Sequence, residues 1–285
     1  MTAIDGDRVM AIAQPDSTRS LPHVGTYRRE LPVALERLYE NALDWEHLPW
    51  LHSSTFASVE CIDVGPWGWR AGVEYTRSSI QPAVLELMLD RDSRRWITRT
   101  LSGPAVGNEV WTHAFAEGQR RTDIVVDFFV PGLPPDRRSA VGESYCRLYA
   151  QLYDEDVSMM TGRQDRLDER AGARPAKTES PPDLGPLDLG PFASLRAQLP
   201  IVVTVADRDY RVVEVDGELH AHATVCPHRL GPLGAVDVRV GVIECPWHGY
   251  RFDVRTGANL DGHGCRLSPA PKVRVDPDTT VVTIG

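Results

Sequence analysis

The sequence predicts an α+β fold in two parts, a mixed N-terminal domain followed by a small all-β domain. Apolar residues recur at helical spacing between residues 31 and 46 and between residues 135 and 168. Short runs rich in β-branched and aromatic residues lie between these helices and again beyond residue 200. A proline-rich stretch separates the two sets of runs, which indicates a domain boundary.

In the first part, we expect an antiparallel sheet curled around one long helix, a helix-grip-like arrangement with room for a ligand. A first helix should begin near Leu31, with Pro32 at a position that helices tolerate. The long helix should begin at Pro135. The expected strands are 56–64, 68–75, 84–89, 95–101, 109–116 and 122–130 in the first part, and 201–206, 210–215, 218–223, 240–244, 272–275 and 280–284 in the second.

Composition divides the chain into four segments. Five prolines between residues 175 and 191 exclude a regular element there. The expected segments are an N-terminal arm (1–26), the first domain (27–168), a proline-rich linker (169–191) and the second domain (192–285).

The bulk charge and the cysteine content exclude several classes of protein. A formal charge of -9 and a pI near 5.5 argue against nucleic acid or an anionic membrane as a partner. The N-terminus resembles no secretion signal, and no apolar run approaches the roughly 18 residues of a membrane span, so we expect a cytoplasmic protein. The five scattered cysteines make a poor disulfide framework, and those beside histidines are better metal ligands.

Two short motifs near the C-terminus each pair a cysteine with a histidine. They are Cys226-Pro-His228 and Cys245-Pro-Trp-His248. Equal numbers of thiolates and imidazoles suit zinc, or a [2Fe–2S] cluster in which two histidines hold one iron. Zinc fingers usually space two cysteines C-x₂₋₄-C, whereas here each loop offers one Cys and one His. The spacing therefore favours the cluster.

This region resembles the Rieske domain of ring-hydroxylating oxygenases over about residues 195–285. The likeness is closest from Cys245 to Gly257, in the segment CPWHGYRFDVRTG. It implies that the [2Fe–2S] ligands are Cys226, His228, Cys245 and His248.

A second group of polar residues lies on the predicted first helix. On a helix, Asn41, Asp44 and His47 would form one stripe, largely away from the apolar face. Pro49 should break this helix and let His52 turn toward His47. The two histidines could bind iron if a carboxylate joins them. The alternative is a polar helix with incidental histidines.

The long helix offers three consecutive carboxylates. By helical periodicity Asp156 falls near the centre of the apolar face, Glu155 at its edge and Asp154 opposite. A carboxylate at the centre of a buried face is costly unless it is paired or binds a metal. We therefore expect Asp156 to be the third ligand; the alternative is that it pairs at the rim with Arg163.

The stretch from Asn41 to His52 resembles the motif N-x₂₋₃-D-x₂-H-x₄-H of Rieske non-haem iron oxygenase alpha subunits. The resemblance implies that His47 and His52 are ligands of a mononuclear Fe(II), and that a late helix supplies their carboxylate. It also implies that Asp44 bridges an iron-bound histidine and a Rieske histidine and carries the electron. The domain order is reversed here, because most members place the Rieske domain first.

These resemblances predict an oxygenase component that uses both centres to activate O₂ and to hydroxylate, demethylate or desaturate a hydrophobic or aromatic small molecule. No G-x-G-x-x-G follows a strand, so electrons should come from a separate reductase or ferredoxin. The family forms head-to-tail trimers, and a homotrimer is expected here, with transfer within one chain as the alternative. A different class, a Rieske ferredoxin-like carrier or ligand-binding protein with a non-catalytic first domain, stays open.

Overall fold

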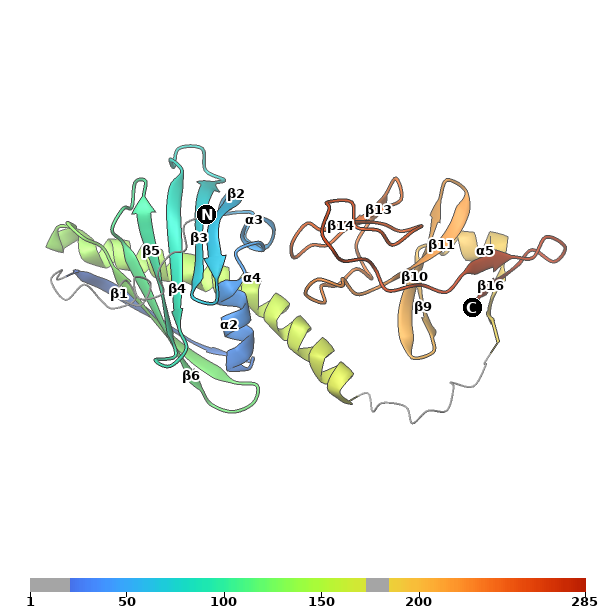
Figure 1. The fold of residues 1–285 in the computed structure, drawn as a ribbon, viewed down its shortest axis with the longest axis horizontal. Helices are drawn as coiled ribbons and strands as arrows, with labels where there is room; N and C mark the ends of the chain where they lie inside the picture. The colour runs from blue at the N-terminus through green and yellow to red at the C-terminus, as the bar shows by residue number, and fades with distance from the viewer. Residues whose placement is uncertain (1–20, 173–184) are drawn as a thin grey trace. The chain divides into compact units, whose positions relative to one another are not determined.

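A computed structural model describes residues 21–172 and 185–285 of the chain. The chain divides into two compact units, Met1–Gln164 and Asp165–Gly285 (Figure 1).

The first unit contains a seven-stranded antiparallel sheet with the strand order β1-β7-β6-β5-β4-β3-β2. The prediction was wrong at its start: strand β1 (His23–Leu31) occupies part of the expected arm and helix. Few apolar residues mark this strand, and its pairing with β7 supplies its hydrogen bonds. The other strands agree closely with the prediction: β2 (Phe56–Gly65), β3 (Gly68–Tyr75), β4 (Ala83–Asp90), β5 (Arg95–Ser102), β6 (Glu109–Ala116) and β7 (Thr122–Phe129).

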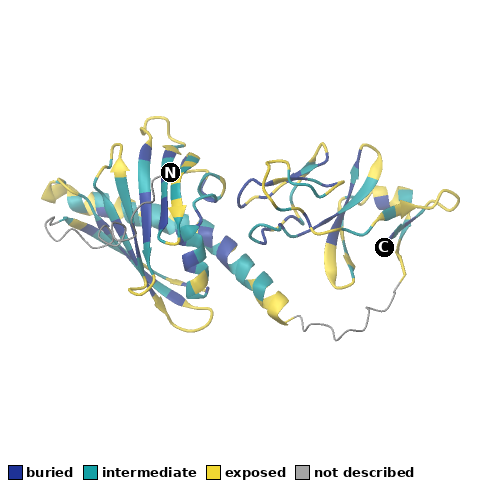
Figure 2. Cartoon of the chain, in the orientation of Figure 1, coloured by how far each residue is buried: buried dark blue, intermediate teal, exposed yellow. Residues whose placement is uncertain are grey.

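One face of this sheet packs against the predicted long helix, α4 (Arg138–Gly172), which follows the short 3₁₀ helix η1 (Pro135–Arg137). Burial alternates along β7, as expected when one face of a strand meets a core. Figure 2 shows buried residues on the strands of the sheet and on α4. The core formed by sheet and helix includes Trp69, Ala71, Trp96, Ile124, Val126, Phe128, Tyr153 and Met160.

The first predicted helix is shorter than expected and is followed by a second one. Helix α2 (Leu35–Leu43) ends at Asp44, whose φ of -94° and ψ of 87° are not helical. Helix α3 (Leu48–Leu51) begins after His47 and has Pro49 in its first turn, where proline is tolerated. The chain therefore breaks before the proline and not at it.

The second unit is built from three small antiparallel sheets of three strands each, ordered β11-β10-β9, β12-β13-β14 and β15-β16-β8. Part of the predicted linker is a strand, because β8 (Leu187–Pro191) pairs with β16; residues 173–184 of the linker and 1–20 of the arm lie outside the described residues. The remaining elements are α5 (Phe192–Arg196), β9 (Ile201–Val205), β10 (Arg208–Val215), β11 (Glu218–Ala223), β12 (Val238–Arg239), β13 (Val242–Glu244), β14 (Arg251–Asp253), β15 (Val273–Val275) and β16 (Val281–Ile284).

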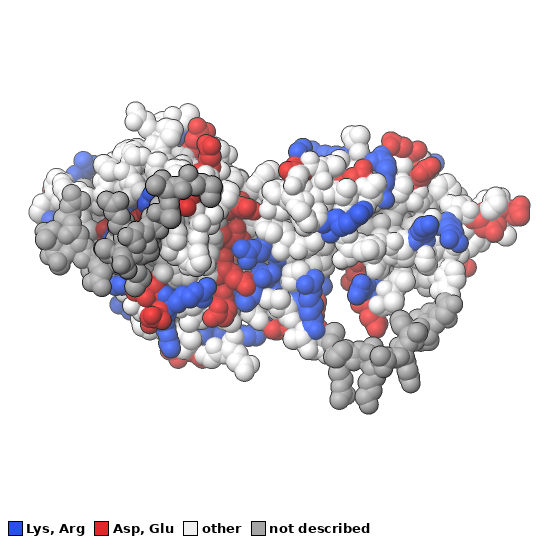
Figure 3. Space-filling model, in the orientation of Figure 1, with Lys and Arg blue, Asp and Glu red and all other residues white. Residues whose placement is uncertain are grey.

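Acidic and basic side chains are mixed on the surface seen in Figure 3. Exposed side chains form ion pairs, such as Arg166 with Glu169 at 3.0 Å and Arg196 with Glu214 at 2.7 Å. Exposed pairs of this kind contribute about 0–1 kcal/mol each. Within residues 21–172 and 185–285, no helix combines the length and the apolar character needed to cross a membrane.

Gly142 lets α4 approach β1 closely. A Cβ at this position would lie 2.0 Å from the carbonyl oxygen of Val24. We expect Gly142→Ala to destabilise the first unit by about 1–3 kcal/mol, because the helix must move off the strand. Urea unfolding followed by tryptophan fluorescence measures this. Gly172→Ala, in the same helix with nothing within 4 Å, should leave the midpoint unchanged, and equal midpoints for both variants would contradict the close packing.

Candidate metal centres

In the first unit, His47, His52 and Asp156 converge on one point. The Oδ1 atom of Asp156 lies 3.5 Å from Nε2 of His47 and 3.2 Å from Nε2 of His52. One ligand atom from each residue lies within 4.8 Å of the other two, and all three residues are buried. Two imidazoles and one carboxylate are the donor set of non-haem iron sites, so the three residues could hold such a metal.

Three helices bring these side chains together. His47 lies between α2 and α3, and His52 caps the C-terminus of α3. The indole of Trp69, on β3, donates a hydrogen bond of 2.8 Å to the carbonyl of Ala42 and fixes the end of α2 on the sheet. Asp156 comes from the buried face of α4, 6 % exposed, where periodicity predicted it.

Each histidine also has a carboxylate on its outer side. Oδ1 of Asp44 lies 4.0 Å from Nδ1 of His47, and Oε2 of Glu155 lies 2.6 Å from Nδ1 of His52. The 2.6 Å contact is a hydrogen bond in which Glu155 accepts the Nδ1–H of His52, which leaves the Nε2 lone pair of His52 for a metal. The 4.0 Å separation between Asp44 and His47 is too long for a hydrogen bond. Both rings present Nε2 to Asp156.

The charges within the site support ionised Asp156. Burial opposes its ionisation, but the hydrogen bond with His52, the adjacent His47 and a 2.9 Å hydrogen bond from Asn41 outweigh burial and lower the pKa of the carboxyl. Burial disfavours the charged form of His52, yet the contacts with Asp156 and Glu155 raise its pKa. The site thus holds a negative carboxylate against two histidines and favours positive charge beside it, which a metal cation would supply in place of the histidine proton.

Two expectations about this site are corrected. Asp44 and His47 do not share a helical stripe, because α2 ends at Leu43 and Asp44 leaves the helical conformation. The alternative partner of Asp156, Arg163, instead contacts Glu40 at 2.6 Å.

A cavity of about 150 Å³ adjoins the three ligand candidates. Its walls are mainly apolar and aromatic. An apolar cavity of this size can hold a molecule as large as benzene. It is lined by Asn41, Ala42, Asp44, His47, Leu48, His52, Phe56, Trp69, Leu85, Leu87, Trp96, Thr98, Tyr149, Leu152, Tyr153 and Asp156.

In the second unit, the two Cys/His loops face each other. The rings of His228 and His248 are 4.5 Å apart between centroids, and Cys226 and Cys245 are each 1 % exposed. A hydrogen bond from the Cys226 thiol lowers the pKa of Cys245 to about 5, and the same contact raises the pKa of Cys226. The two sulfurs thus lie close together, as the two cysteine ligands of one iron must, and both would lose their protons when the metal binds.

Gly231 lets the first loop lie close to a sulfur of the second. A Cβ at this position would lie 2.7 Å from Sγ of Cys245, so only glycine fits beside this sulfur. The ring of His228 stacks on Tyr250 at 4.3 Å, and Tyr250 stacks on exposed His263 at 3.8 Å. The sequence pattern did not predict this stack, because His263 is remote from both motifs. The donor set fits a two-Cys, two-His cluster.

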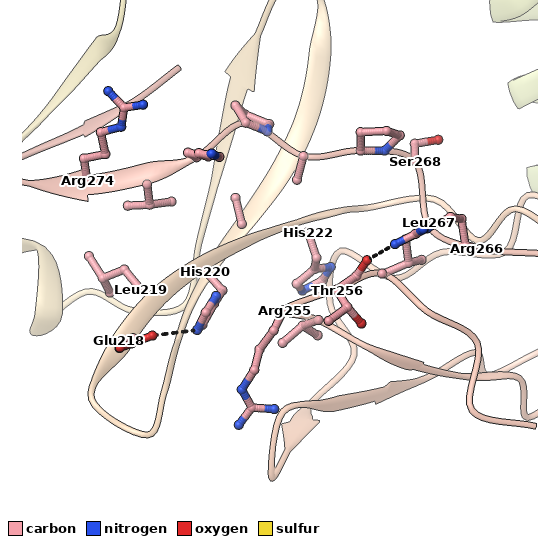
Figure 4. A pocket seen from close by; sticks show the side chains of 18 residues that line it. Glu218, Leu219, His220, His222, Arg255, Thr256, Arg266, Leu267, Ser268 and Arg274 are labelled. Carbon is pink, nitrogen blue, oxygen red and sulfur yellow. Dashed lines mark hydrogen bonds and ion pairs between the residues drawn. The ribbon is translucent and has the colours of Figure 1, made fainter.

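A separate hollow of about 640 Å³ lies between β11 and the segments 254–257 and 266–274 (Figure 4). Nδ1 of His222, a residue that is 1 % exposed, donates a 3.0 Å hydrogen bond to the carbonyl of Ala223. His220 lies 3.8 Å from Glu218. None of the four cluster-ligand candidates lines this hollow, so it is distinct from the Cys/His loops.

Comparison with protein families assigns residues 187–271 to the Rieske [2Fe-2S] domain. The second unit therefore contains a Rieske domain. Its cluster is [2Fe–2S], and the function it implies is electron transfer or oxygenase-related.

Similar proteins share this domain and not the whole chain. The ferredoxin component of the naphthalene 1,2-dioxygenase system of Pseudomonas aeruginosa is 38 % identical over 58 residues, which are 20 % of this chain and 56 % of the ferredoxin. Apoptosis-inducing factor 3 of Mus musculus is 37 % identical over 73 residues, 26 % of this chain and 12 % of that protein. The chain thus spans about half or less of these relatives. The solved ferredoxin of carbazole 1,9a-dioxygenase from Nocardioides aromaticivorans IC177 is 28 % identical, with a TM-score of 0.31, covering 35 % of this chain and 95 % of that ferredoxin.

Replacing His228 by Cys tests the cluster geometry. The variant should show a changed EPR signal and a lower reduction potential, because histidine ligation raises the potential of a [2Fe–2S] centre. EPR spectroscopy and redox titration of the purified protein measure both. His220→Ala, outside the loops, should leave both unchanged. A colourless wild-type protein containing one zinc would contradict the assignment.

Proposed function

We propose that this chain is the oxygenase component of a Rieske non-haem iron system. Cys226, His228, Cys245 and His248 hold the cluster, and the first unit holds a mononuclear Fe(II). When bound, the cluster supplies single electrons and the Fe(II) supplies a place where O₂ is activated beside an organic substrate. The observation that carries the proposal is the convergence of His47, His52 and Asp156, since an electron carrier needs no second metal site.

In the first unit, one set of residues would bind the metal and another would line the substrate cavity. His47, His52 and Asp156 would hold the metal beside the cavity, where substrate and O₂ would bind. Trp69, Trp96 and the other apolar walls exclude water and orient a hydrophobic molecule. The 150 Å³ volume favours a substrate with about one aromatic ring.

We also propose the electron donor, the electron route and the assembly of the oxygenase. Electrons come from a separate reductase or ferredoxin. Asp44, whose carboxylate faces the outer nitrogen of His47, carries the electron route on the mononuclear side. A homotrimer is the proposed assembly.

A Rieske ferredoxin-like electron carrier with a non-catalytic first unit is the second candidate. It is favoured by the relatives, two of which are ferredoxin components of dioxygenase systems. In that case the three buried ligand candidates would serve only as a hydrogen-bonded polar cluster within the core.

Metal analysis separates the two candidates. The oxygenase should contain about three irons per two sulfides, and the carrier about two irons per two sulfides. Asp156→Ala should lower the iron content to the carrier value while the Rieske spectrum stays the same, because one of three ligands is lost. Asp154→Ala, whose side chain is 67 % exposed, is the control. Two irons per two sulfides in the reconstituted wild type would reject the oxygenase.

Asp44→Ala should keep both metal centres yet lower turnover about 10–100-fold, because the proposal gives this carboxylate the electron route and makes it a ligand of neither metal. Single-turnover kinetics of the pre-reduced protein with O₂ measures the oxidation of the Rieske cluster. Glu46→Ala, two residues along the same loop, is the control. An unchanged rate in Asp44→Ala would show that Asp44 does not link the centres.

A further inference from the structure

We infer that Glu155 is a positioning residue for the mononuclear metal, holding His52 in its ligand orientation. This inference rests on the proposed function, because it concerns the same metal site. Glu155 is one of the three consecutive carboxylates of the long helix, and its contacts assign it a role different from that of Asp156.

Two consecutive residues of α4 hold the two ring nitrogens of His52. Asp156 lies 3.2 Å from Nε2, and Glu155 lies 2.6 Å from Nδ1. Successive residues of a helix project about 100° apart, which places the two carboxylates on different sides of one imidazole. Because Glu155 is hydrogen-bonded to the outer nitrogen, it lies away from the point where the three ligand atoms meet.

The second oxygen of Glu155 is held by two further side chains. Nε2 of Gln151, one turn earlier in α4, donates a 3.0 Å hydrogen bond to Oε1 of Glu155. The same amide donates a 2.7 Å hydrogen bond to Oγ of Ser54, and Ser54 lies 3.5 Å from Oε1 of Glu155. This network joins α4 to the loop just after α3. Glu155 is therefore held by Gln151, which lies on α4, and by Ser54, which follows His52 in the chain.

The arrangement has a consequence for metal binding. A carboxylate that accepts the Nδ1–H of a ligating histidine fixes the tautomer and the ring plane and increases the basicity of the other nitrogen. His47 has Asp44 at the longer distance of 4.0 Å, so the shorter 2.6 Å contact makes His52 the more firmly oriented ligand. Loss of such a partner typically weakens metal binding about 10–100-fold.

The test measures Fe(II) binding by equilibrium dialysis of the full chain, anaerobically, with the Rieske cluster intact. Glu155→Ala should weaken Fe(II) binding at the mononuclear site about 10–100-fold. Glu155→Gln should weaken it less, because the amide oxygen still accepts the Nδ1–H without the charge. Asp154→Ala removes the same charge from the neighbouring, exposed position and should bind Fe(II) as the wild type does. Tryptophan fluorescence checks that each variant is folded.

The outcomes separate this inference from the proposed function. No mononuclear Fe(II) in the wild type rejects the proposed function. Wild-type binding with equal affinity in Glu155→Ala rejects only the role of Glu155. Binding abolished in both Glu155 variants as completely as in Asp156→Ala would make Glu155 a ligand and overturn the positioning role.

Discussion

The first unit depends on the burial of one carboxylate. Asp156 lies at 6 % exposure on the inner face of α4, where an unpaired charge would cost several kcal/mol. The cost of burying this charge is offset by a hydrogen bond from Asn41 and by contacts with the imidazoles of His47 and His52, which lie at the two ends of α3. The broken helix, the sheet that carries it and the cavity beside it are all arranged around this group.

The two units provide different environments for metal chemistry. The ligand candidates of the first unit lie on α4 and at the two ends of α3, against a core that is largely apolar, and they adjoin a cavity of about 150 Å³ suited to an organic molecule. Those of the Rieske domain lie on two loops, where the ring of His228 stacks on Tyr250 and Tyr250 stacks on exposed His263.

The carboxylates behind the two histidines of the proposed iron site differ in their contacts. Glu155, on α4, accepts a hydrogen bond from the outer nitrogen of His52, whereas Asp44, at the end of α2, lies 4.0 Å from the outer nitrogen of His47. A carboxylate hydrogen-bonded behind a histidine is common at metal sites and supports the proposed oxygenase. The likeness to ferredoxin components rests on the Rieske domain alone.

The sequence by itself determined the Rieske motifs, most strands, the long helix and the position of Asp156 on its inner face, because spacing and periodicity are local properties. Only the tertiary structure decided three features. Strand β1 exists through its pairing with β7, a contact between segments about a hundred residues apart. Helix α2 ends at Asp44, before Pro49, because packing of Trp69 on Ala42 fixes its last turn. Glu155 faces the outer nitrogen of His52 because α3 folds back onto α4, and no local pattern reports such a contact.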